Sequence, residues 1–157
     1  MEKNKRGGQQ LAFLLSQVGA HAAMKFAERL AVLKLVPADA GILRILGTDS
    51  HISQQELSVR LGIHPSRLVA ILDGLESRKL VERKPNAGDR RQYELHLTAK
   101  GGETLVEIGG IAREHQESLC ASLTSAEREK LGELLKRIAG EQGLTPGVHP
   151  GYRRLKP

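Results

Sequence analysis

The first helix expected from the sequence is apolar on almost all sides. Between residues 11 and 35, apolar side chains recur at steps of three and four, which is typical of a long helix. This stripe comprises Leu11, Leu15, Val18, Ala22, Phe26, Leu30 and Leu33. Further apolar residues lie off the stripe, namely Phe13, Leu14, Ala23, Met24 and Ala27. Such a helix has to be covered on two sides. A chain of 157 residues has too little left to cover both, so a partner subunit is expected.

A short helix is expected directly after the long one. Pro37 suits a first helical turn, because proline lacks the amide hydrogen that would have no partner there. The helix should cover residues 38–46, and Gly47 is expected to end it.

Two more helices joined by a tight turn follow. Ser53 stands three residues before Glu56, the spacing at which the two side chains bond free amides at a helix start. This helix should end at Gly62, because glycine readily adopts a left-handed turn. His64 and Pro65 open the next helix. Its buried stripe is expected to comprise Leu68, Ile71, Leu72 and Leu75.

The pattern then changes from helical to alternating. Residues 80–84 and 92–97 alternate between apolar and polar side chains, which indicates two strands. Residues 85–89 between them are rich in turn-forming types. A β-hairpin is therefore predicted directly after the helical pair.

Two closing helices are predicted. Thr98 should cap a helix that reaches about residue 123, and Thr124 with Glu127 repeats the capping-box spacing before a last helix. The first carries Leu105, Ile108, Ala112, His115 and Leu119 on one face. The second is marked by Leu131, Leu134, Leu135 and Ile138. From Gly140 onward no period is visible, so this tail is expected either to wrap around the protein or to trail from it.

Composition narrows the class of protein. Hydrophobic residues make up 39% and charged residues 27%, a balance typical of globular domains. A single cysteine excludes a disulfide framework and a multi-cysteine zinc site, and suits a reducing cytosol. Gln17, His21 and Lys25 interrupt the longest apolar segment, so neither a membrane span nor a secretory signal is expected. A cytoplasmic location is predicted.

Positive charge is concentrated in one short segment. The chain has a formal net charge of +6. Residues 78–91 hold six basic and two acidic residues, whereas residues 101–151 hold five basic and eight acidic ones. A short basic segment beside a more acidic helical region indicates that the protein binds an anionic partner through that segment.

The helical pair has the form of a DNA-binding helix-turn-helix. If its apolar stripe is buried, the second helix presents Ser66, Arg67 and Ala70 outward. Arginine can read guanine with two hydrogen bonds, serine can bond a base edge or phosphate, and alanine can touch a thymine methyl group. Ser53 and Gln54 stand where the free amides of a helix start favour phosphate.

The hairpin would extend this DNA-binding surface. Arg90 and Arg91 at its tip, with Lys84 on its flank, could enter a narrow minor groove, where negative potential is strongest. Asp89 would repel phosphate, so its expected role is an ion pair that holds an arginine and the hairpin in shape. The alternative for this turn is an ordinary solvated charged loop.

Several runs of residues resemble the MarR family of winged helix-turn-helix transcription regulators. The likeness extends over nearly the whole chain. The more specific part is Asp89-Arg-Arg91 followed by Leu97-Thr-Ala-Lys-Gly101. The other matching runs are Ile52 to Gly62, His64 to Leu68 and Leu75 to Arg83.

This resemblance implies a mainly α fold with a small β-hairpin wing. Residues 1–157 would form one domain, with dimerisation helices at 9–35 and 101–141, a winged helix-turn-helix lobe at 36–100 and a tail at 142–157. It also implies that the protein is a sequence-specific regulator. The protein would bind double-stranded DNA as a homodimer, at a pseudo-palindromic operator. Such regulators are most often repressors, commonly relieved by a small anionic aromatic ligand. Arg91 would enter the minor groove while Asp89 braces the wing.

The residues that would sense a signal, such as a bound ligand, a metal ion or an oxidant, are harder to identify from the sequence. A ligand pocket between the dimer helices and the lobe could be lined by His21, Met24, Lys25, Arg44 and His115. No two of the six histidines are four residues apart on a helix, so no metal site or other cofactor is predicted, although His21 and His115 could still meet across helices. Cys120 is expected to be a small buried apolar residue.

Catalysis is not expected. The chain has no Gly-x-Ser-x-Gly elbow and no phosphate-binding glycine loop, and its glycine pairs lie within helical patterns. The alternative to a DNA-binding regulator is a winged-helix dimer that docks another protein. Salt dependence separates the two, because each phosphate contact adds about −0.9 to the log–log slope of affinity against salt.

Overall fold

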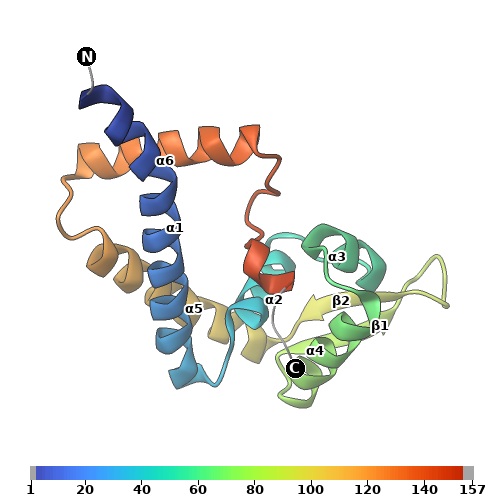
Figure 1. The fold of residues 1–157 in the computed structure, drawn as a ribbon. Coiled ribbons are helices and arrows are strands. Elements are labelled where there is room, and N and C mark those ends of the chain that lie inside the picture. The colour runs from blue at the N-terminus through green and yellow to red at the C-terminus, as the bar shows by residue number, and fades with distance from the viewer. Residues whose placement is uncertain (1–2, 154–157) are drawn as a thin grey trace.

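The computed structural model describes residues 3–153, with side chains from residue 10 onward. This range is mostly helical with one two-stranded hairpin (Figure 1). Residues 1–2 and the last four residues of the predicted tail lie outside it. The elements are α1 (Lys3–Leu30), a 3-10 turn (Ala31–Leu33), α2 (Pro37–Thr48), α3 (Gln54–Leu61), α4 (Pro65–Ser77), β1 (Val81–Pro85), β2 (Tyr93–Leu97), α5 (Ala99–Leu119), α6 (Ser125–Glu141) and a second 3-10 turn (Pro150–Arg153).

Three predicted helix ends were wrong. The first helix stops at Leu30, and after a 3-10 turn the chain reverses at Lys34, which has a left-handed φ of 54°. Helix α5 ends at Leu119, four residues early. Gly47 lies inside α2 and does not end it. The side chain of Leu105 occupies the space a Cβ at Gly47 would need, so glycine there allows α5 to approach α2.

The helix-turn-helix forms as its caps predict. The Ser53 hydroxyl accepts from the Glu56 amide, and the Glu56 carboxylate accepts from the Ser53 amide at 2.8 Å. Gly62 takes a left-handed φ of 62° and ends α3. Pro65 then begins α4, with His64 as its N-cap. Each boundary depends on neighbouring residues alone, which is why the sequence pattern locates it.

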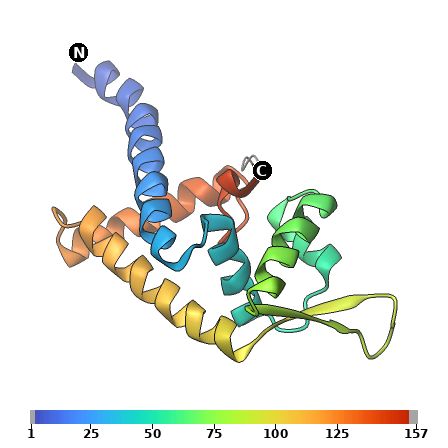
Figure 2. The ribbon, with the colours of Figure 1, turned by 90° about the horizontal axis from the view of Figure 1, so that it is seen from below.

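The wing is an antiparallel pair that projects beyond the helices (Figure 2). Val81 pairs with Leu97 at its base, and Pro85 pairs with Tyr93 toward its tip. A further backbone hydrogen bond of 3.0 Å, from the Leu95 amide to the Ile52 carbonyl, ties β2 to the turn before α3. The base of the wing is therefore held against the helix-turn-helix.

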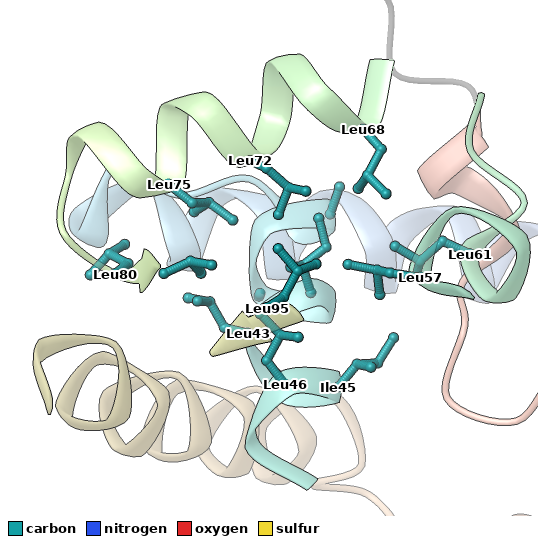
Figure 3. Close-up of a cluster of buried hydrophobic side chains, with 14 of the residues drawn as sticks. Leu43, Ile45, Leu46, Leu57, Leu61, Leu68, Leu72, Leu75, Leu80 and Leu95 are labelled. Carbon is teal, nitrogen blue, oxygen red and sulfur yellow. The ribbon is translucent and has the colours of Figure 1, made fainter. Parts of the chain in front are cut away.

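One leucine-rich core joins α2, α3, α4 and the wing (Figure 3). Its fully buried members include Leu43, Leu57, Leu61, Leu68, Leu72, Leu80 and Leu95. Burying one such side chain contributes about 1.5–3 kcal/mol, so this cluster dominates the stability of the lobe. Ile71, expected in the same stripe, is only partly buried.

Large apolar faces of α1 and α6 remain uncovered in the single chain. Phe13 is 66% exposed, and the amino-terminal half of α1 projects from the body (Figures 1 and 2). The other exposed apolar residues of these two helices are Leu11, Leu14, Leu15, Val18, Met24, Leu131, Leu134, Leu135 and Ile138. None of the described helices is long and apolar enough to cross a membrane.

The described part of the tail wraps back onto the lobe. Tyr152 is buried against Gly41 of α2, where a Cβ would lie 2.7 Å from the tyrosine ring. The Arg44 guanidinium donates to the Gly147 carbonyl, and Arg67 donates to the Arg153 carbonyl at 3.2 Å. Tertiary contacts therefore order a segment in which the sequence shows no period.

Candidate nucleic-acid interface

The start of α4 presents the predicted base-reading residues. Ser66 and Ala70 are exposed, whereas Arg67 is half-buried. The Ser66 hydroxyl lies 2.8 Å from Nδ1 of His64, and the Arg67 guanidinium donates to Arg153 in the tail. To read a base, the Arg67 guanidinium must therefore break its hydrogen bond to the Arg153 carbonyl, or divide its N–H donors between that carbonyl and the base.

The start of α3 lies beside the wing. Ser53, Gln54 and Arg91 line a shallow cavity of about 400 Å³ between α3 and the hairpin, together with Pro65 and Tyr93. Residues from three separate segments are thus brought to one surface. The Ser53 hydroxyl already accepts the Glu56 amide, so its first role is to cap α3.

The cap of α3 makes a testable contribution to stability. Hydrogen bonds from the amide and hydroxyl of Ser53 hold the pKa of Glu56 below its usual value of 4.5. A carboxylate whose pKa is lowered by folding stabilises the protein above the unfolded pKa and loses that effect as the pH falls through the folded value. We expect Glu56→Gln to be less stable than wild type at pH 7 and equal to it at acidic pH. Thermal unfolding at several pH values measures this, and a pH-independent difference would contradict it.

The wing tip differs from the prediction in one respect. Arg90 and Arg91 are exposed as expected. The predicted ion pair of Asp89 with an arginine was wrong, because among the described residues the carboxylate of Asp89 has a backbone amide, and not a guanidinium, as its partner. Instead the Asp89 carboxylate accepts the backbone amide of Arg91 at 3.0 Å, an Asx-type turn. Asp89 therefore shapes the loop and leaves both guanidinium groups free for an anion.

Asn86 is the second residue whose side chain fixes the shape of the loop. Its amide oxygen accepts from the backbone amides of Gly88 and Asp89, at 2.7 and 3.2 Å. Lys84, expected on the DNA-binding flank, forms a 2.8 Å ion pair with Glu82 on its own strand. Because this pair is exposed, it leaves Lys84 able to approach phosphate at little cost.

Two of the six basic residues in segment 78–91 serve the fold. Arg83 forms ion pairs with Asp73 at 2.7 Å and Glu76 at 2.9 Å, which bind β1 to α4. Arg78 donates to the carbonyls of Leu33 and Lys34, after α1. The count of charges over residues 78–91 therefore overstates the charge available to DNA. Sequence reasoning missed these roles because each partner lies at least seven residues away.

The predicted ligand-pocket residues divide between two cavities. His21, Lys25 and His115 line one of about 530 Å³ together with Arg29, between α1 and α5. Burial, followed by the charges of Arg29 and His21, lowers the pKa of His115. Arg44 lines a different, larger cavity beside the tail, because α2 turns its side chain toward Gly147.

Two other predicted positions also differ. Met24 is 52% exposed and lines neither of the two cavities above. Cys120 is partly exposed at the end of α5, and was predicted to be buried.

The comparisons with known proteins agree with this geometry. Residues 34–92 match the family model described as the MarR family. The chain is 30% identical, over 87% of its length and 83% of the relative's, to a putative transcriptional regulatory protein for the hcr operon of Thauera aromatica. A second relative, the transcriptional repressor MprA of Escherichia coli, is 32% identical over 55% of this chain and 49% of its own.

Solved structures show the same fold. The transcriptional repressor CouR bound to a 23-mer DNA duplex matches with a TM-score of 0.76 and 31% identity, over 88% of this chain and 99% of its own. A MarR variant from E. coli complexed with operator DNA matches with a TM-score of 0.70 and 27% identity, over 82% and 92% of the two chains. From its fold, its wing and these likenesses, the chain belongs to the MarR family of transcriptional regulators, which are not enzymes.

Proposed function

We propose that the protein is a homodimeric repressor that binds a pseudo-palindromic operator in the cytoplasm. Each α4 would enter a major groove, and each wing would place Arg91 in the adjacent minor groove. The observation that carries this proposal is the shared surface of α3 and the wing, where Ser53, Gln54 and Arg91 line one cavity. Half-sites should lie about one helical turn, roughly 34–36 Å, apart. The DNA-bound relatives favour this function over protein docking.

The uncovered faces of α1 and α6 support the homodimer. Leu11 and Phe13 of α1, and leucines together with Ile138 of α6, are exposed in the single chain. Large exposed apolar surface of this kind marks a protein interface. A dimer would also set the spacing of the two α4 helices. DNA binding therefore depends on residues that do not touch DNA.

The cavity between α1 and α5 supports a small anionic ligand. Lys25 and Arg29 supply positive charge, and His21 and His115 supply donors beside apolar walls. Lys25 is paired closely with Glu28 at 2.8 Å, whereas Arg29 lies 3.9 Å from Glu114. Arg29 is therefore the better partner for a ligand carboxylate. The cavity lies between two of the predicted dimerisation helices, where a ligand could alter the spacing of the lobes.

Replacing Arg91 by alanine tests the DNA-binding proposal. We expect operator affinity to fall by about 1–3 kcal/mol, roughly 5- to 150-fold, and the salt dependence to become less steep by about one phosphate contact. The measurement is fluorescence anisotropy at two salt concentrations, with a duplex from the protein's own upstream promoter and a scrambled duplex. Arg113→Ala, on the exposed surface of α5, is the matched control. Equal binding of the Arg91 variant and wild type would refute the role of the wing.

A further inference from the structure

Three potential metal ligands meet at the base of the wing. His51 lies in the turn before α3, and Glu94 and His96 lie on β2. Nδ1 of His51 is 2.9 Å from Oε2 of Glu94, and Nε2 of His96 is 3.3 Å from the same oxygen. Among the described residues this is the one group of three whose ligand atoms all lie within 4.8 Å of one another.

These separations match a tetrahedral metal site. Zinc binds histidine nitrogen and carboxylate oxygen at about 2.0–2.2 Å, which places neighbouring ligand atoms of a tetrahedron about 3.3 Å apart. The His96–Glu94 distance equals that value. The His51–Glu94 distance of 2.9 Å is that of a hydrogen bond, and a shift of about 0.4 Å would bring it to the same value. The two imidazole rings meet edge to face, with centroids 4.7 Å apart.

The backbone holds the three residues in place. Ser53 pairs with Glu94 as an isolated bridge, and the Leu95 amide bonds the Ile52 carbonyl, so the two segments cannot separate without breaking main-chain bonds. His51 adopts a left-handed φ of 76°, a conformation that is uncommon outside glycine and is often found at functional sites.

A fourth residue orients the carboxylate. The Asn86 side-chain amide donates to Oε1 of Glu94 at 2.9 Å, which leaves Oε2 facing both histidines. Metal-binding carboxylates commonly have such an outer hydrogen bond. His51 and Asn86 also line an open cavity beside the cluster, so an ion can enter from solvent. The arginine that lines this cavity, Arg60, is paired with Asp49 at 2.9 Å.

We infer that His51, Glu94 and His96 bind a divalent transition-metal ion, for which Zn²⁺ is the best match, with water as the fourth ligand. Two imidazoles and one carboxylate suit zinc, whereas calcium and magnesium prefer oxygen ligands. The ion would link the turn before α3 to β2 and so fix the wing relative to the helix-turn-helix. The site itself does not depend on the proposed DNA binding.

Metal titration of the full chain, freed of metal by a chelator, tests this inference. We expect one Zn²⁺ per chain by competition with a chromophoric chelator, and the visible absorption of four-coordinate Co²⁺ when Co²⁺ is used. Glu94→Gln keeps the side-chain shape, and His51→Asn keeps a residue that tolerates left-handed φ. Each should weaken binding at least tenfold. His64→Asn retains a good helix cap and should bind as wild type does.

A second measurement locates the ion and separates binding from misfolding. Zinc should slow amide hydrogen exchange in residues 49–53 and 81–97 of wild type and leave it unchanged in Glu94→Gln. Circular dichroism without metal establishes that the variants are folded. Equal zinc affinity in wild type and both variants, or protection confined to other segments, would overturn the inference.

Discussion

Replacing Leu134 and Ile138 of α6 with glutamate is expected to convert the dimer into a monomer and to abolish tight operator binding. Both side chains are more than 40% exposed in the single chain, so the protomer should fold without them. Removing one buried leucine-sized side chain weakens the free energy of dimerisation by about 1.5–3 kcal/mol. Each unpaired charge buried in its place costs several kcal/mol more. The dimer should therefore weaken at least about a thousandfold, which corresponds to roughly 4 kcal/mol.

Operator binding should fall with the dimer. Two linked half-site contacts bind about 10²- to 10⁴-fold more tightly than one, and a monomer loses that gain. Light scattering after gel filtration measures the oligomeric state, and anisotropy measures DNA affinity. Glu129→Gln with Glu133→Gln is the control on the same helix, because at 100° per residue these positions lie 100–180° around the helix from Leu134 and Ile138. A dimer with wild-type DNA affinity after the leucine and isoleucine replacements would exclude α6 from the interface.

Gly101→Ala should be the more damaging of two neighbouring glycine substitutions. Gly101 lies in the first turn of α5, where its amide is bonded by the Thr98 hydroxyl at 2.9 Å. The Leu80 carbonyl occupies the space that an added Cβ would need. That carbonyl also accepts the Thr98 amide, so neither partner moves freely. We expect a loss of about 1–3 kcal/mol, the usual cost of overpacking.

Gly102→Ala provides the matched control for Gly101→Ala. It adds the same atom one residue later in the same helix, where nothing lies within 4 Å. Alanine in a helix interior is favoured over glycine by about 0.5–1 kcal/mol, so this variant should be as stable as wild type or more stable. Urea unfolding of both variants measures the difference. Similar stabilities for the two would contradict the close approach of α5 to Leu80.

The family motif Leu97-Thr-Ala-Lys-Gly101 thereby gains a structural explanation. Thr98 caps α5 and also donates its hydroxyl to the Lys79 carbonyl, while Lys100 donates to the Arg78 carbonyl at 3.0 Å. Because Gly101 has no side chain, α5 can lie directly against the Leu80 carbonyl. The motif thus joins α5 to the turn that leads into the wing. A ligand that moves α5 would move the wing through these bonds.

The sequence by itself determined the order and type of the helices and strands, because these depend on residues that are close together in the chain. The capping residues Ser53, Thr98 and Thr124 act within three positions of themselves, so the starts of α3, α5 and α6 were predicted correctly. Helix α1 has no such signal, and it begins at Lys3, earlier than predicted. The alternation of polar and apolar residues likewise predicted both strands within one residue of their ends. The exposed faces of α1 and α6 also follow from their own apolar pattern.

Only the tertiary structure decided which polar groups meet. Arg83 belongs to the basic segment that pointed to an anionic partner, but it pairs with Asp73 and Glu76. Arg44 lies away from the cavity predicted for it. His51 and Glu94 are 43 positions apart and meet only because β2 folds back beside the turn before α3. Helix caps and apolar periods are properties of neighbouring residues, whereas ion pairs, cavities and ligand clusters depend on how distant segments pack.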